Sequence, residues 1–128
     1  MKPESKLVQR VRSVLEFTPH SWLSEKLHGN IFQCGLPDTV FITPEGQCVW
    51  IEFKMAERFS LALLQGRQRL VCLRWAMRGV PVFVVGQGSG LWYADLRHYE
   101  NATCSAPMVT RPAEAYALLC ASLAMDVQ

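Results

Sequence analysis

Apolar residues near the amino terminus recur with the spacing of one helical face. The residues on this face are Leu7, Val8, Val11, Val14 and Leu15. Pro3 suits the first turn of a helix, and Pro19 stops the pattern, because proline lacks the backbone N–H that a helix interior needs. The pattern therefore predicts a helix over Lys2–Phe17.

Short segments rich in β-branched and aromatic residues follow this helix. A weak one surrounds Trp22 and Leu23, and two stronger ones cover Thr39–Ile42 and Cys48–Phe53, on either side of a Thr-Pro-Glu-Gly-Gln turn. The stronger pair is predicted to form a β-hairpin. Both faces of this hairpin are apolar, which is typical of strands covered on both sides in a layered α/β domain.

The second half of the chain alternates helix and strand patterns. We predict a long helix over Ser60–Arg78 ended by Gly79, strands over Val80–Val85 and Leu91–Tyr93, a loop over Asn101–Thr110 and a helix over Pro112–Met125. The glycines between the two strands are expected to form a hairpin turn and not a dinucleotide-binding loop, because a strand follows them. The element order predicts a single α/β domain in which helices flank a mixed sheet.

Composition limits the class of protein. The 128 residues suit one domain, and a chain that is half hydrophobic and 19% charged is not a disordered tail. No apolar run could span a membrane and the first residues carry no secretory signal, so we expect a cytoplasmic protein without membrane contact. The five cysteines are scattered, so we expect mostly buried thiols and no zinc site. A net charge of +2 permits a polyanionic partner without arguing for one.

Three charged residues, Asp38, Glu52 and Lys54, interrupt the apolar hairpin. If the turn is a three-residue loop, Asp38 lies directly opposite Glu52, where like charges repel. A divalent cation such as Mg²⁺ or Mn²⁺ between the two carboxylates would relieve that repulsion. Lys54 lies two residues beyond Glu52 and so points to the same face of the strand. The combination predicts hydrolysis, in which a cation activates water and a lysine positions that water or neutralises a phosphate.

Two further polar residues lie on apolar helical stripes. Glu4 extends the stripe of the first helix, which makes it either a third carboxylate for the site or a first-turn acid favoured by the helix dipole. Gln68 lies in the middle of the inward stripe of the long helix, with Gln65 at its edge. Its central place makes Gln68 the preferred site residue.

Pro37–Asp38 followed by Glu52–Lys54 resembles the signature of the PD-(D/E)XK nuclease superfamily, and Gln68 resembles its trailing glutamine. Within that superfamily, residues 4–86 are similar to the VRR-NUC group, which is related to Holliday-junction resolvases. The residues that carry the resemblance are Gly35–Asp38, Ile51–Lys54, Ser60, Gln68 and Gly79–Val82. The resemblance implies a restriction-endonuclease-like αβββαβ core and phosphodiester cleavage that depends on Mg²⁺ or Mn²⁺.

The resemblance also implies roles for individual residues. The metal ligands would be Asp38, Glu52, the Phe53 carbonyl and Glu4, the last as the acid of the family's first helix. Lys54 would assist the attacking water. The turn around Gly66 leaves either Gln65 or Gln68 as the motif glutamine.

DNA is the expected substrate, and the relation to junction resolvases favours branched DNA. Basic rows on two helices are candidate phosphate contacts. They comprise Lys2, Lys6 and Arg10 on the first helix and Arg67, Arg74 and Arg78 on the long helix. The alternatives are a nuclease-fold module that binds DNA or a protein without cutting, and an interaction domain that does not bind nucleic acid.

A second apolar stripe on the long helix predicts a further contact. Leu63, Leu70 and Met77 recur every seven residues, with Leu73 nearby, almost opposite the stripe of Gln68. Either the uncharged carboxyl-terminal helix or a second copy of the chain would cover this stripe. We expect a homodimer, because a twofold axis would hold two cleavage sites in a fixed relation on a branched substrate.

Overall fold

The computed structural model describes residues 2–27, 36–100 and 102–128. The elements in chain order are α1 (Pro3–Glu16), β1 (Leu23–Lys26), β2 (Thr39–Ile42), β3 (Cys48–Met55), the 3-10 turn η1 (Leu61–Leu63), α2 (Gly66–Met77), β4 (Val82–Gln87), β5 (Gly90–Asp95), the 3-10 turn η2 (Leu96–His98), β6 (Thr103–Pro107) and α3 (Pro112–Val127). The chain is a single α/β domain, and the predicted αβββαβ order is confirmed.

One sheet of six strands forms the centre of the domain, with the strands in the order β1 to β6. All neighbouring strands are antiparallel except β3 and β4, which are parallel. A parallel pair needs a crossover, and the crossover here contains α2. The mixed sheet predicted from the element order is therefore present.

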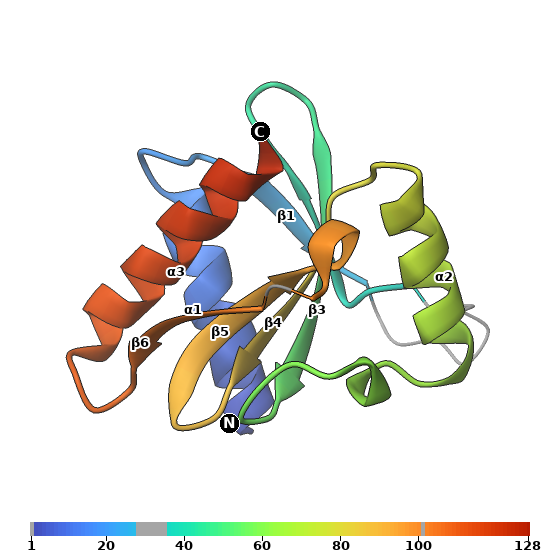
Figure 1. Cartoon of the computed structure of the whole chain (residues 1–128). Helices are drawn as coiled ribbons and strands as arrows, with labels where there is room; N and C mark the ends of the chain where they lie inside the picture. Colours follow the sequence, from blue (N-terminus) through green and yellow to red (C-terminus); the bar gives the residue numbers. More distant parts are fainter. Residues whose placement is uncertain (1, 28–35, 101) are drawn as a thin grey trace.

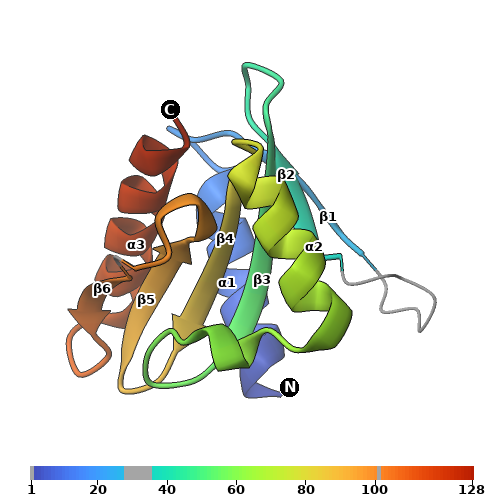
Figure 2. The same ribbon diagram turned by 45° about the vertical axis from the view of Figure 1, so that its right-hand side comes forward.

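The sheet is the middle of three layers (Figure 1). Helices α1 and α3 cover one face, and α2 lies against the other, as the rotated view also shows (Figure 2). Each face has its own apolar cluster. The larger cluster joins α1 and α3 to inward residues such as Phe41, Phe53 and Phe83, and the smaller joins α2 to Val82, Val84 and Trp92.

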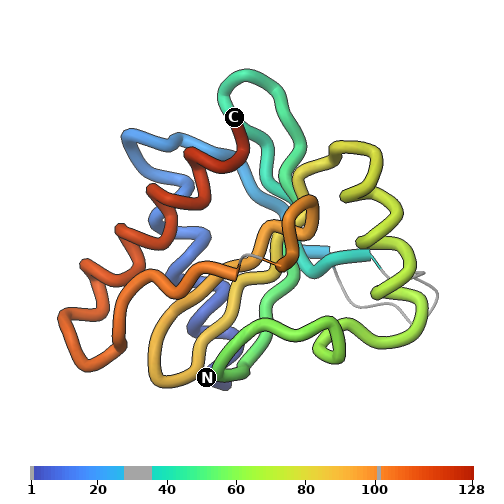
Figure 3. Tube along the Cα trace, viewed as in Figure 1, coloured from blue at the N-terminus to red at the C-terminus, as the bar shows by residue number. Residues whose placement is uncertain are grey.

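The β2–β3 hairpin has the register expected from a three-residue loop. Thr39 pairs with Ile51 and Ile42 pairs with Cys48. Thr43 closes the loop, because its N–H donates to the Gln47 carbonyl at 3.0 Å and its own carbonyl accepts from the Gly46 N–H at 2.8 Å. Gly46 has a φ of 86°, a conformation that favours glycine. The tube view shows this loop projecting from one end of the sheet, beside the carboxyl terminus (Figure 3).

The long helix predicted over Ser60–Arg78 is wrong at its start. Residues Leu61–Leu63 form a 3-10 turn, Leu64 and Gln65 are extended, and α2 begins only at Gly66, where φ is 54°. The apolar pattern did not show this break, because Leu64 is buried like a residue of the helical stripe although it lies in the extended segment before the helix. The end of the helix is confirmed, since Gly79 follows α2 with a φ of 85°.

The loop predicted over Asn101–Thr110 is also wrong, because Thr103–Pro107 forms β6. The sequence of β6 has low strand propensity, and its backbone is ordered by antiparallel pairing with β5 across a register shift at Leu91/Trp92. The neighbouring strand β5 is longer than the predicted Leu91–Tyr93 segment, and all its residues are buried.

Most cysteines were expected to be buried, and this holds for Cys72 and Cys120 but not for Cys48 and Cys104, which are exposed. Burial raises the pKa of the Cys72 thiol and of the Cys120 thiol to about 12, so both stay protonated at neutral pH. Cys34 lies outside the described residues.

No helix in the described part of the chain is long and apolar enough to cross a membrane.

The second apolar stripe predicted on the long helix is divided, because Leu63 lies on η1 and packs against the smaller cluster, whereas Leu70 and Met77 lie on α2. Helix α3 does not cover the part of this stripe that lies on α2. It packs with α1 on the opposite face of the sheet, so that explanation for the stripe is wrong. Leu70 is 55% exposed and Met77 is 86% exposed. Both side chains therefore remain available to another molecule.

Candidate active site

The two strands of the hairpin separate at Asp38, and two side-chain hydrogen bonds replace the backbone ladder there. The Asp38 N–H donates to Glu52 Oε1 at 3.0 Å, and the Phe53 N–H donates to Asp38 Oδ2 at 3.1 Å. The Asp38 carbonyl accepts from the Leu27 N–H at 2.7 Å, which ties it to the end of β1. The predicted opposition of Asp38 and Glu52 is confirmed, and each carboxylate is fixed by the other strand's backbone.

Lys54 and Gln68 complete this cluster. Lys54 Nζ lies 3.2 Å from Glu52 Oε2, and its side chain is 28% exposed. The Gln68 side chain, in the first turns of α2, also forms a hydrogen bond to Glu52. Gln65 precedes the first residue of α2, its side chain makes no capping hydrogen bond to the helix, and it is exposed. The structure therefore brings Gln68, and not Gln65, to the two carboxylates.

Glu52 is the most buried charged group of the site, with 4% of its surface exposed. Burial raises the pKa of its carboxyl from 4.5 to about 7, and the Asp38 carboxylate acts in the same direction. Lys54 and Gln68 oppose this increase in pKa only in part. The site consequently favours a positive charge, either a proton or a metal ion, beside Glu52.

The Phe53 backbone faces the gap left by β2. In a strand, the N–H and C=O of one residue point to the same side. The Phe53 N–H points to Asp38, so its carbonyl is directed toward the same gap, while its side chain is buried in the cluster beneath α1 and α3. A carbonyl oxygen and two carboxylates then border one small region at the end of the hairpin.

Oxygen donors of this kind suit a hard divalent cation such as Mg²⁺. Proteins commonly bind Mg²⁺ with one or two carboxylates, and the ion keeps several waters. Among the described residues, no group of three or more His, Cys, Asp or Glu side chains could hold a metal ion. Glu4 is thus not gathered with Asp38 and Glu52. It is exposed in the first turn of α1, because the buried stripe begins only at Leu7 and the helix covers the other face of the sheet.

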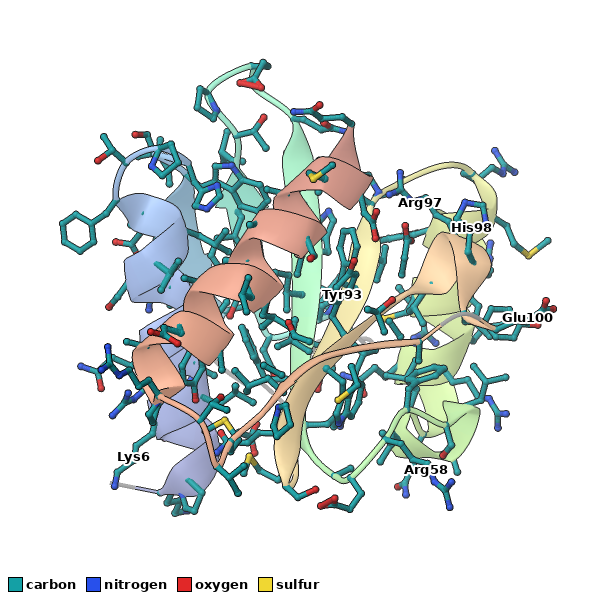
Figure 4. The ribbon with its side chains drawn as sticks, turned by 60° about the vertical axis from the view of Figure 1, so that its left-hand side comes forward. Lys6, Arg58, Tyr93, Arg97, His98 and Glu100 are labelled. Carbon is teal, nitrogen blue, oxygen red and sulfur yellow. The ribbon has the colours of Figure 1, made fainter. Side chains whose placement is uncertain are left out.

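The two basic rows lie on different layers. Arg67, Arg74 and Arg78 are exposed on α2, the layer that Glu52 and Lys54 face. Lys6 and Arg10 are exposed on α1, beyond the opposite face, and Lys2 is exposed immediately before that helix. The Arg10 guanidinium lies 5.6 Å from the centre of the Tyr116 ring on α3. Figure 4 shows the same division, with Lys6 on the α1 side and Arg58 on the α2 side.

A tryptophan lies over the strand partner of Lys54, and the sequence motif does not reveal it. Lys54 pairs with Gly86, and Gly86 pairs with Trp92 on the next strand. A Cβ atom on Gly86 would fall within the Trp92 ring, so the indole lies over the glycine that pairs with Lys54. Trp92 Nε1 donates to the Ala56 carbonyl at 2.8 Å. A glycine inside a strand indicates such a close approach, and this signal could have revealed it.

The segment after Lys54 is anchored by a second missed contact. The Glu57 carboxylate accepts from the Ser89 N–H at 2.7 Å and from the Ser89 hydroxyl at 2.5 Å. Gly88 has no room for a side chain because Glu57 lies against it. The β4–β5 turn and the end of β3 are therefore held together next to the site.

Comparison with solved structures finds similarity to Hjc, a Holliday junction resolvase from the archaeal hyperthermophile Archaeoglobus fulgidus. The two chains share 15% sequence identity with a TM-score of 0.47, and the match covers 88% of this chain and 96% of Hjc. No protein-family model and no curated protein matches the sequence.

The raised pKa of Glu52 makes stability depend on pH. A carboxyl whose pKa is about 7 in the folded state and 4.5 in the unfolded state stabilises the fold through its protonated form. This contribution is complete below about pH 4.5 and is lost as the pH rises through about 7. In metal-free buffer, Glu52→Gln should therefore melt close to wild type at pH 4.5 and above wild type at pH 8. A difference in melting temperature that does not change with pH would contradict this.

The contact between Gly86 and Trp92 predicts a coupled pair of substitutions. Gly86→Ala should destabilise the domain by about 1–3 kcal/mol, because the new methyl group must displace the indole. In a Trp92→Leu background the same change should cost clearly less. Urea denaturation of the four proteins in this double-mutant cycle measures the coupling energy. Additive effects would show that Gly86 is needed for another reason.

Proposed function

We propose that this protein is a metal-dependent DNA endonuclease of the PD-(D/E)XK superfamily, similar to its VRR-NUC group. The observation that carries the proposal is the cluster of Asp38, Glu52, Lys54 and Gln68 at the point where the hairpin opens. A binding module would not need two carboxylates forced together beside a lysine, since that arrangement opposes folding at neutral pH.

Asp38, Glu52 and the Phe53 carbonyl would hold Mg²⁺ or Mn²⁺. When bound, such a cation lowers the pKa of water and stabilises the charge that develops on a phosphate. Its charge would also offset the repulsion between Asp38 and Glu52 and would favour the ionised form of Glu52, whose pKa is raised by burial. Glu4 is omitted from this ligand set.

Lys54 would act at the reacting phosphate. Its ammonium group lies against Glu52 Oε2 and is part-exposed, so it can contact both a bound cation's ligand and a substrate oxygen. From there it positions the attacking water or neutralises the phosphate charge. Gln68 fixes the Glu52 carboxylate through its hydrogen bond and so orients a ligand without reacting itself.

The substrate that we propose is branched DNA, bound through exposed arginines of α2. Arg67 and Arg74 lie on the same side of the sheet as Lys54 and are the better-placed phosphate contacts. Lys2, Lys6 and Arg10 lie beyond the other face and would reach only a second arm of a large substrate. A homodimer, with the exposed Leu70 and Met77 at its interface, would hold two such sites together.

Metal binding and cleavage can be separated by two substitutions. Mn²⁺ should raise the melting temperature of wild type, because a ligand that binds only the folded state stabilises it. Asp38→Asn, which keeps an oxygen acceptor for the Phe53 N–H, should lose both this shift and the cleavage of DNA. Lys54→Ala should keep the shift but lose cleavage by at least about 100-fold.

The measurement is a thermal melt with and without Mn²⁺, beside a cleavage assay on linear, flapped and four-way DNAs with matching single-stranded RNA. Cleavage by Lys54→Ala at the wild-type rate would reject its assigned role. Equal Mn²⁺ shifts in wild type and Asp38→Asn would reject the metal site, and a preference for RNA would change the substrate.

The dimer is tested by light scattering at micromolar concentration. Wild type should have twice the 14.5 kDa mass of the chain, and Leu70→Glu should fall to the monomer mass because it buries a charge in the interface. Leu70 is 55% exposed within one chain, so this variant should still fold. A monomeric wild type rejects the dimer, and a dimeric Leu70→Glu protein moves the interface elsewhere.

A further inference from the structure

A hollow of about 380 Å³ opens along one side of α2 and is lined by Val71, Arg74, Trp75 and Arg78. These residues follow one edge of the helix over two turns. Both arginines are exposed, and neither forms an ion pair with another described residue. The hollow thus combines two available guanidinium groups with an apolar and aromatic wall, at a volume typical of a small-ligand site.

The aromatic wall leads to the carboxylates. The ring centres of Trp75 and Trp50 are 4.9 Å apart at an angle of 60°, and both tryptophans are only half-buried. Trp50 lies on β3, two residues before Glu52 and on the same face of the strand. Two residues of a strand span about 6.6 Å, so this tryptophan pair lies next to the proposed cleavage site.

We propose that this hollow binds an unpaired nucleotide adjacent to the bond that is cut, with its base against Trp75 and its phosphate at Arg74 and Arg78. The inference rests on the proposed nuclease function and adds the substrate class. The enzyme selects DNA in which bases are unpaired, such as a flap or the open centre of a junction.

The chemistry of the wall favours an unpaired base over an intact duplex. The bases of a duplex stack on one another and leave no face for a protein ring, whereas an unpaired base can stack on tryptophan. Arginine serves the same class of ligand, because its planar fork binds phosphate and also stacks on bases. A site that bound only the phosphates of a duplex would need the two arginines but would not need a tryptophan ring.

Charge argues against a second copy of the chain as the occupant. Helix α2 carries Arg67, Arg69 and Arg74 and no acidic residue, and Arg78 follows as its carboxyl-terminal cap. A twofold contact centred on the hollow would place Arg74 and Arg78 of one copy against the same arginines of the other, which is unfavourable, whereas a polyanion neutralises them. The dimer contact proposed through Leu70 and Met77 lies about 100° around the helix from the centre of the hollow, so Arg74 is only at its edge.

The test measures DNA binding without metal, so that no strand is cut. Fluorescence anisotropy compares a single-stranded oligonucleotide, a flapped duplex and a blunt duplex in EDTA. Arg74→Ala and Arg78→Ala should weaken binding of the first two, each lowering the slope of log affinity against log salt by about 0.7. Arg69→Ala is the matched control, because it removes the same charge from an exposed position on the same helix outside the hollow.

Trp75→Leu tests the stacking contact. It should weaken single-strand binding about tenfold and leave blunt-duplex binding within about twofold of wild type. Wild type should quench the fluorescence of a 2-aminopurine base in the oligonucleotide, and Trp75→Leu should not. If this variant does not fold, the two arginine variants carry the test, since both side chains are exposed.

Three results would overturn the inference. Equal losses in Arg69→Ala and Arg74→Ala would show diffuse attraction, and equal losses on all three DNAs would show that the hollow does not distinguish unpaired bases. A change of oligomeric mass in Arg74→Ala without a change in DNA binding would assign the hollow to a protein contact.

The two proposals fail separately. A wild type that binds DNA as described but never cuts it in Mg²⁺ or Mn²⁺ refutes the nuclease activity and does not contradict the binding site.

Discussion

The site depends on a pair of hydrogen bonds that the sheet itself cannot supply. Where β2 leaves β3, the N–H groups of Asp38 and Phe53 would lose their ladder partners, and the Glu52 and Asp38 carboxylates accept from them instead. The exchange is reciprocal, so each acid is fixed by the backbone of the other strand. Two carboxylates are therefore held close together by the same contacts that complete the fold at this end of the hairpin.

That arrangement has an energetic consequence. Glu52 is almost fully buried beside a second carboxylate, and its pKa of about 7 shows that Lys54 and Gln68 do not fully compensate its charge. A purely structural pair of hydrogen bonds would be more stable with neutral amides, since an amide oxygen also accepts from N–H. The proposed cation would take up the charge that Lys54 and Gln68 leave unbalanced.

Much of this site could be predicted from the sequence, because the hairpin turn determines the register and hence places Asp38 opposite Glu52. The choice between Gln65 and Gln68 needed the structure, since extended residues before Gly66 remove Gln65 from the helix. Strand β6 depends on pairing with a distant segment, which local propensity does not show. Glu4 was assigned by its helical stripe, but the layer that α1 occupies is set by tertiary packing. The position of Trp92 over Gly86, the strand partner of Lys54, likewise required the order of three strands.

Helix α2 would link the proposed chemistry to the proposed recognition of the substrate. Gln68, near its start, orients Glu52, and Trp75, two turns later, contacts Trp50 on the strand that carries Glu52 and Lys54. Cys72, which lies between Gln68 and Trp75, and Ala76, which follows Trp75, are buried against the sheet and fix the rotation of the helix about its axis. A shift of α2 would consequently move the Glu52 partner and the wall of the hollow together. Binding of a base against Trp75, as proposed, and orientation of the proposed metal-binding carboxylate would thus be coupled through one rigid element, so that a substrate with unpaired bases would also be the substrate that is cut most efficiently.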